Sequence, residues 1–431
     1  MRITLLDTLA PDPNAPTVHD VIAELGDVTT HPLGAERFGP CEGCFECWVA
    51  HPGTCKAKDD ANRIMRDWAS ADEVVWRVTP FLGGWSSAAK RALDKCIGLI
   101  LPFFTTVDGE THHKARYARL PRLGVVAEVD AEVPDVERAR FAHLVGRNAL
   151  NLGAPHPWVA WVRRGAPVAE VRAAVAAARA APDPGFPAQP PFVEPASRGV
   201  PAGPTPRRVL LVVGSAKTGE QSTSSALGHA VLARLRARGW ATAELDLPRV
   251  VKLGRPDVSE LQEAVANADL VVLAFPVYFD SLPALVTAAF ERLRPRFGGP
   301  ALLPVVQCGF PELAHTGVAL ELCAAAAARL GFAWAGHLAL GGAGPLRDAP
   351  LHEARGVAWR QVQALDRAAA ELDAGGPVTG ATGDLFSTPM MPAGFYRLAG
   401  DLGWLAGAFQ HGALTALLAR PFEPGTESPP G

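Results

Sequence analysis

The stretch over residues 209–227 constrains the fold most, because it joins three structural signals in a fixed order. Residues 209–213 form an apolar run that suits a fully buried parallel strand. A loop of small hydroxyl side chains follows Gly214, and a helical apolar pattern begins at Ser225. The free N–H groups of a first helical turn and the helix dipole favour an anion at such a place. The stretch predicts either a phosphate-binding loop or a serine-capped helix behind a buried strand.

The loop matches neither of two common phosphate-binding patterns. It lacks the Gly-Lys-Ser/Thr ending of a P-loop, and it lacks the Gly-x-Gly-x-x-Gly sequence of dinucleotide-binding folds. Its hydroxyl side chains can nevertheless donate to a phosphate. These candidate donors are Ser215, Thr218, Ser222, Thr223 and Ser224.

Length and composition limit the classes of protein to consider. The 431 residues suggest roughly two to three domains, and 48% hydrophobic with 20% charged residues suits a globular protein with an ample core. A net charge of −3 without a basic run argues against a nucleic-acid partner. We find no apolar window typical of a membrane span and no signal peptide, so we expect a cytoplasmic protein that does not bind membranes.

Apolar runs alternate with helical patterns along most of the chain, which predicts parallel βαβ units. Five buried strands are expected in each half, and we predict an α/β fold with two tandem flavodoxin-like, doubly wound, five-stranded parallel sheets. The expected strands are residues 2–6, 28–33, 72–79, 123–129 and 158–162 in the first half, and 209–213, 242–247, 270–275, 302–307 and 334–340 in the second.

The two halves also repeat each other in sequence. Ala71-Asp72 precedes a strand that opens at Pro80 into a turn of small residues, and Ala268-Asp269 precedes a strand that opens at Pro276 in the same way. Nine prolines between residues 182 and 206 indicate an extended linker. We expect four segments, namely a first domain at 1–181, the linker at 182–206, a second domain at 207–376 and an aromatic docking tail at 377–431.

Equivalent loops of the two halves carry different chemistry. After its first strand, the first half has acids and prolines over residues 7–16, which disfavour a phosphate. After its second strand it has Cys41, Cys44, Cys47 and Cys55 in the spacing Cys-x2-Cys-x2-Cys-x7-Cys. This spacing is compact enough for a [4Fe–4S] cluster, but zinc or a metal-free cysteine loop remain alternatives.

These motifs resemble the NAD(P)H-dependent FMN reductase and iron–sulfur flavoprotein group. The resemblance rests on Gly214-Ser215 with residues 221–224, on residues 276–283, and on the cysteine loop with its trailing Asp59-Asp60. It implies FMN at the carboxyl ends of the second half's strands. The implied FMN-binding residues are Ser215, Lys217, Thr218, Gln221, Ser222, Thr223, Ser224, Pro276, Val277, Tyr278, Phe279, Asp280, Ser281, Cys308, Gly309 and Phe310.

The resemblance implies an FMN-dependent oxidoreductase that moves electrons between NAD(P)H, or an iron–sulfur cluster, and a small acceptor such as a quinone or a flavin. The flavin carries the chemistry, so we expect no separate catalytic acid or base. The alternative is a non-enzymatic electron-transfer protein that serves a partner. We expect a homodimer or an internal pseudo-dimer of the two halves, with any cluster in the first half facing the FMN.

Three further features have structural interpretations. His112 and His113 lie in a polar insertion, for which a solvated loop is the expected environment. Cys308 is expected to be a small buried core residue if it does not contact the flavin. Aromatic residues at near-helical spacing, among them Tyr396 and Trp404, predict a helix in the C-terminal tail.

Overall fold

The chain divides into two compact units, and its last segment returns to the first of them. Unit 1 comprises Met1–Ala188 and Arg397–Gly431, and unit 2 comprises Gln189–Tyr396. The computed structural model describes residues 1–9, 17–36, 39–183, 185–200, 206–217, 222–253, 255–296, 298–346, 351–352 and 356–423.

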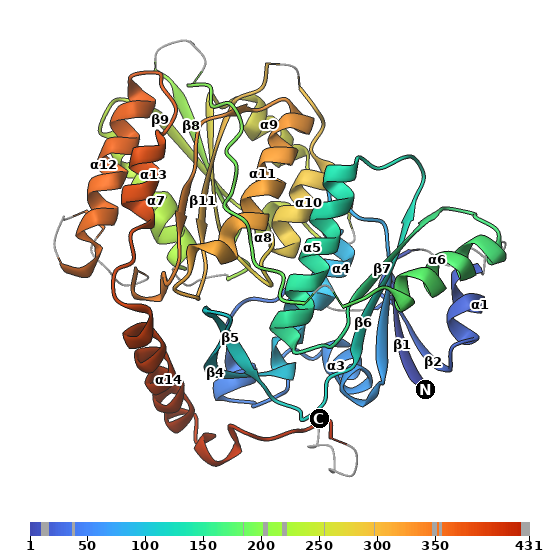
Figure 1. Ribbon diagram of the computed structural model, residues 1–431. Coiled ribbons are helices and arrows are strands. Elements are labelled where there is room, and N and C mark those ends of the chain that lie inside the picture. The colour runs from blue at the N-terminus through green and yellow to red at the C-terminus, as the bar shows by residue number, and fades with distance from the viewer. Residues whose placement is uncertain are drawn as a thin grey trace. The chain divides into compact units, whose positions relative to one another are not determined.

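Unit 1 contains a five-stranded parallel sheet with helices on both faces (Figure 1). Its strand order is β2-β1-β3-β6-β7, which is the order 2-1-3-4-5 once the separate β4–β5 hairpin is set aside. The elements are β1 (Arg2–Asp7), α1 (Thr17–Ala23), β2 (Asp27–Pro32), α2 (Glu46–Val49), α3 (Ala61–Ser70), β3 (Glu73–Val78), α4 (Ser87–Leu93), η1 (Asp94–Leu99), β4 (Ile100–Val107), β5 (Glu110–Ala115), β6 (Arg122–Val129), α5 (Asp135–Leu152), β7 (Trp158–Arg163), α6 (Val168–Ala180), and, from the C-terminal segment, most of α14 (Ala393–Gln410) with η5 (Leu414–Ala416).

Unit 2 repeats this order. Its sheet runs β9-β8-β10-β11, and the fifth position holds two short strands, β12 and β13, which both pair with β11 in parallel. The elements are β8 (Arg208–Val213), α7 (Thr223–Arg236), β9 (Ala241–Asp246), α8 (Leu247–Val250), α9 (Ser259–Ala266), β10 (Leu270–Pro276), α10 (Ala284–Arg292), β11 (Ala301–Gln307), η2 (Leu313–Thr316), α11 (Gly317–Leu330), β12 (Ala333–Trp334), β13 (Leu338–Leu340), η3 (Gly344–Leu346), η4 (Gly356–Ala358), α12 (Trp359–Asp373) and α13 (Gly380–Ser387).

The predicted fold class is therefore confirmed: each unit has the strand order of a flavodoxin-like sheet. The duplication extends to individual hydrogen bonds. Asp72 accepts from the Arg2 amide at 2.8 Å, and Asp269 accepts from the Arg208 amide at 2.7 Å. Each aspartate stands just before the third strand of its sheet and fixes that strand against the first.

Both faces of each sheet are buried, as continuous apolar strands require. In unit 1, Trp76 of β3 packs between Trp68 and Trp85, with ring centroids 5.9 Å and 5.2 Å apart. The opposite face packs against α1 and α6. In unit 2, one face packs against α7, α12 and α13, and Figure 1 shows α9, α10 and α11 beyond the other.

The region predicted as a solvated polar insertion forms part of an antiparallel hairpin. Residues 105–120 contain most of an antiparallel hairpin, in which β4 pairs with β5 through Thr105 and His112. His112 is 2% exposed, and its Nδ1 lies 2.9 Å from the Asn151 side-chain oxygen. The solvated-loop interpretation of His112 was wrong, because Thr111 and His112 of β5 are both buried in unit 1.

One helical window passes a length and composition test for crossing a membrane. Among the described residues it is Leu313–Leu330, with a mean hydropathy of 1.2. Most of it, 61%, is buried inside the protein, as in the core helix of a globular domain. It consists of η2 and α11.

A buried ion network closes the carboxyl end of the unit 1 sheet. Arg77 donates from Nη1 to Asp7 at 3.1 Å and from Nη2 to Glu128 at 3.0 Å, and all three side chains are at most 5% exposed. His19 Nε2 lies 3.0 Å from the same Asp7 carboxylate. Burial alone raises the pKa of Asp7, but hydrogen bonds from His19 and the Leu9 amide and the charge of Arg77 hold it below its ordinary value.

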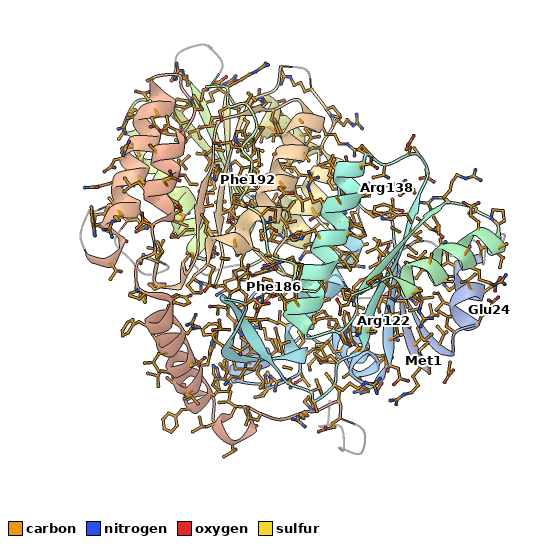
Figure 2. The ribbon with its side chains drawn as sticks, viewed as in Figure 1. Met1, Glu24, Arg122, Arg138, Phe186 and Phe192 are labelled. Carbon is orange, nitrogen blue, oxygen red and sulfur yellow. The ribbon has the colours of Figure 1, made fainter. Side chains whose placement is uncertain are left out.

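Replacing Arg77 with Met should destabilise unit 1 by about 3 kcal/mol or more, because two buried carboxylates lose their cation. Urea unfolding followed by tryptophan fluorescence measures this change. Arg172→Met is the matched control: Arg172 pairs with Glu24 at the surface, where Figure 2 labels Glu24, and its loss should change little. Equal losses of unfolding free energy in the two variants would contradict a stabilising role for the buried Arg77 network.

Candidate functional site

The predicted phosphate loop lies between β8 and α7 of unit 2. Ser222 caps α7, and its hydroxyl oxygen accepts from the Ser225 amide at 3.1 Å. The amides of Thr223 and Ser224 have no acceptor among the described residues. Ser215 is buried at the start of the loop, while Thr218 and Gln221 lie outside the described residues. The helix start thus presents N–H groups suited to an anion.

The second predicted loop, after β10, is a tight turn. Tyr278 and Ser281 exchange two backbone hydrogen bonds of 3.1 Å, and Phe279 and Asp280 have φ values of 49° and 55°. Positive φ at both central residues defines a type I′ turn. The turn directs backbone groups, rather than one particular side chain, toward its outer side.

Unit 1 contains the same turn at the equivalent position. Phe81 and Gly84 exchange backbone hydrogen bonds of 2.9 and 2.8 Å, and Leu82 and Gly83 have φ values of 54° and 73°. The turn is therefore part of the duplicated framework. The side chains around this turn differ between the two units.

Asp280 of the unit 2 turn pairs with a histidine that the sequence did not single out. Asp280 Oδ1 lies 2.8 Å from His315 Nδ1, and the two side chains are 4% and 1% exposed. The carboxylate accepts, so Nδ1 carries the proton. The Phe310 ring packs on His315 with centroids 4.5 Å apart. The pair joins the turn after β10 to the segment after β11. No local sequence pattern around His315 predicts this contact.

The third predicted loop, after β11, connects with the first. Gln307 Nε2 donates to the Ser224 hydroxyl at 3.3 Å, so the end of β11 and the start of α7 are neighbours. Cys308 is buried, and its amide donates to the Leu340 carbonyl at 3.1 Å. The space at Gly309 is open, since a Cβ there would meet no heavy atom within 4 Å. Of the predicted residues after β11, Gly309 leaves room for a ligand and Cys308 does not face solvent.

Tyr396, at the first turn of α14, covers this third loop within unit 2. Its hydroxyl donates to the Gly309 carbonyl at 2.8 Å. Its ring lies against Gly342, where a Cβ would come within 3.2 Å of it. Burial raises the pKa of Tyr396 to about 12, so it remains a neutral donor. The sequence predicted a helix here but not this contact.

The equivalent edge of unit 1 is closed to a phosphate. By alignment of the duplicated strands, Asp7, Arg77 and Glu128 occupy the positions of Val213, Ala274 and Gln307 in unit 2. Two buried carboxylates would repel a phosphate, and Arg77 is already engaged by both. The geometry agrees with the expectation of a degenerate phosphate loop, of which residues 10–16 lie outside the described part.

The four cysteines of unit 1 gather around one place. Burial and the nearby thiols of Cys55 and Cys44, with Asp94, raise the pKa of Cys41 to about 12. Burial and the other three thiols likewise raise the pKa of Cys47 well above its usual value. The backbone amides of Gly43 and Ala57 act to lower the pKa values of Cys41 and Cys55, against the larger opposite effect of burial.

Cations surround these thiols. Arg116 is 1% exposed and donates to the carbonyls of Gly98, Ile100, Leu417 and Ala419, but among the described residues it has no carboxylate partner. Its charge acts to lower the pKa of Cys47, and the charge of Lys95, which is paired with Asp59, acts to lower that of Cys55. A cation buried beside the thiols would stabilise an anionic group there.

Aromatic rings cover the cysteine loop. Phe45, between two of the cysteines, stacks on Trp48 at 5.2 Å, and Trp404 of α14 lies 5.4 Å and 5.1 Å from these two rings. His113 lies 4.5 Å from Trp48. His113 is thus a partly buried member of an aromatic cluster. The cluster packs α14 against the cysteine loop within unit 1.

The strand order of each unit defines a flavodoxin-like fold. Residues 207–325 match the model of a family described as NADPH-dependent FMN reductase. This segment contains all three loops described above. A search of curated proteins finds no match.

Several solved structures resemble about two fifths of the chain. An azoreductase from Bacillus anthracis is 17% identical, with 39% of this chain and 98% of that chain covered and a TM-score of 0.30. An NAD(P)H:quinone oxidoreductase from Methanothermobacter marburgensis is 18% identical, with 38% and 95% covered and a TM-score of 0.30. An apo NADH:FMN oxidoreductase is 22% identical, with 41% and 93% covered and a TM-score of 0.32. The fold assignment rests on the strand order and not on these scores.

Cys308 should be chemically inert despite its place after β11, because burial raises the pKa of its thiol to about 12. Iodoacetamide at pH 8 should leave it unmodified in the native protein and alkylate it after denaturation. Peptide mass spectrometry measures both. Rapid alkylation in the native state would show an exposed thiolate instead.

Proposed function

We propose that this protein is an FMN-dependent NAD(P)H oxidoreductase that binds FMN in unit 2 and reduces a small acceptor such as a quinone or a flavin. The observation that carries the proposal is the set of three loops at the carboxyl ends of β8, β10 and β11, within the segment that matches the FMN reductase family. Ligands of doubly wound sheets bind at this edge.

The residues present fit FMN. The unsatisfied amides of Thr223 and Ser224 and the hydroxyls near them suit the 5′-phosphate. The type I′ turn at Tyr278–Ser281 supplies backbone to lie along the ring system. The open surface at Gly309 allows a flat ring to approach the third loop. The remaining predicted contacts, including Lys217, Val277 and Phe310, belong to the same three loops.

FMN, when bound, supplies hydride acceptance from NAD(P)H and electron transfer to the acceptor. The chain's own residues place and enclose it. Ser222 fixes the start of α7, and Gln307 ties β11 to that helix through Ser224. Asp280 holds the His315 proton on Nδ1 and so keeps the turn against the segment after β11. Tyr396 fixes the carbonyl of Gly309.

Ser222→Ala should weaken FMN binding about 10-fold, because the first turn of α7 loses its cap and a phosphate donor. Fluorescence quenching during FMN titration measures the affinity. Ser86→Ala is the matched control, because Ser86 caps α4 of unit 1 in the same way and should leave FMN affinity unchanged. Protein that stays colourless with FMN, or equal losses in both variants, would contradict the proposed site.

The acceptor test separates an enzyme from an electron carrier. Steady-state oxidation of NADH or NADPH with a quinone or free flavin supports the oxidoreductase. A flavin that photoreduces but does not turn over with either nucleotide supports the electron-transfer protein instead.

A second cofactor belongs to the same proposal: a [4Fe–4S] cluster on Cys41, Cys44, Cys47 and Cys55. Three observations favour it over a bare cysteine loop. The four thiols are near enough to affect one another's pKa values, the amides of Gly43 and Ala57 favour the thiolate forms of Cys41 and Cys55, and buried Arg116 has no carboxylate partner among the described residues. Hydrogen bonds and nearby charge of this kind stabilise thiolate clusters.

Cys47→Ala should abolish a cluster, since one iron loses its thiolate. Iron and acid-labile sulfide are assayed on anaerobically purified protein, together with the visible spectrum. Cys323→Ala, at a buried cysteine of α11, is the control and should retain both. Absence of sulfide with bound zinc would replace the cluster by a structural metal site.

A further inference from the structure

Helix α14 turns its charged residues toward the protein and its large apolar residues toward solvent. Its charged residues are Arg397 and Asp401, and both face the protein: Arg397 donates to the Thr111 hydroxyl at 3.2 Å, and Asp401 accepts from the Phe104 amide at 3.0 Å. Trp404 packs on the same side, against Phe45 and Trp48. A surface helix normally places its polar residues outward.

The outward face is instead apolar and carries no charge. Its five large side chains, which are between 38% and 74% exposed, follow the spacing 3-4-3-4 of a helix–helix seam. Together they expose roughly 600 Å² per copy, at the upper limit of the apolar patches of monomeric proteins. These residues are Phe395, Leu398, Leu402, Leu405 and Phe409.

The residues of this face form a complementary pattern about Leu402, in which each of two leucines stands opposite an alanine. Phe395 stands seven residues before it and Phe409 seven residues after it. Leu398 stands four before, and the small Ala406 four after; the small Ala399 stands three before, and Leu405 three after. Both alanines are exposed.

This pattern allows two copies of the helix to pack against each other in antiparallel orientation. An antiparallel two-fold axis at Leu402 brings residue 402 − n of one helix against residue 402 + n of the other. Leu398 then meets Ala406, Leu405 meets Ala399, and Phe395 meets Phe409. Leu398 and Leu405 thus find small partners, as ridge-into-groove packing favours, while Leu402 meets Leu402 at the axis and the phenylalanines meet each other.

We propose that the outward face of α14 binds the same face of a second copy of this chain, antiparallel, with Leu402 at the two-fold axis. A membrane surface fits less well, because interfacial helices carry Lys or Arg beside their apolar face and the one basic residue of α14 is turned inward. With its rim of small residues, the face approaches the ~800 Å² per partner of a standard interface.

Sedimentation equilibrium of the full chain tests the proposal. The wild type should be a dimer, and Leu402→Glu should weaken the dimer about 100-fold or more, because two like charges would face each other at the axis. Val136→Glu, at an exposed valine of α5, is the matched control and should remain dimeric. Leu402 is 56% exposed, so the monomeric variant should keep the wild-type circular dichroism.

Mixing two oppositely charged variants tests whether Leu402 of one copy meets Leu402 of the other. Leu402→Glu and Leu402→Lys should each be monomeric alone and should form a heterodimer together, since opposite charges then meet at the axis. A monomeric wild type, a dimeric Leu402→Glu, or a mixture that stays monomeric would overturn the proposal. So would a monomer that floats with phosphatidylserine vesicles through this face.

Discussion

Parallel strands bring all their carboxyl ends to one edge, and the chemistry of both units depends on this constraint. A buried parallel sheet satisfies its own backbone, so only the loops beyond its edge are available to bind a ligand. In unit 2 the neighbouring strands β8, β10 and β11 place three loops together, and the bond from Gln307 to Ser224 joins two of them. The distant positions 215, 278 and 309 come to the same edge of the sheet for this reason.

The two units show how a duplicated framework comes to hold different chemistry. The aspartates before the third strands and the type I′ turns after them are the same in both. At the sheet edge, however, unit 2 has the uncharged Val213 and Ala274, whereas unit 1 has the ion pair of Asp7 and Arg77. The backbone is the same while a few side chains give the edge of unit 1 buried charges that the edge of unit 2 lacks at these two positions.

Much of the fold was readable from the sequence, because its signals are local. Apolar runs predicted the parallel strands, and the three loops of unit 2 follow from their place after those strands. Helix α12 and the β4–β5 hairpin were missed, the latter because the polar sequence of β5, with two adjacent histidines, is typical of a solvated loop and gives no sign of the buried partner Asn151.

The missed site features are all long-range contacts. The Asp280–His315 pair joins residues 35 positions apart, and Tyr396 meets Gly309 across 87 positions. The burial of Arg116 among backbone carbonyls was also not predicted, because the local sequence around a charged residue does not indicate that it is buried. Such contacts depend on topology, which periodicity and spacing do not encode.

The return of the chain to unit 1 affects how the protein is made. Buried Arg116 depends on the carbonyls of Leu417 and Ala419, and Trp404 covers the cysteine loop. During synthesis these groups follow all of unit 2, although domains that are continuous in sequence fold from the N-terminus onward. Unit 1 is therefore completed only after unit 2 has been made, and until then its cysteine loop lacks the contact with Trp404.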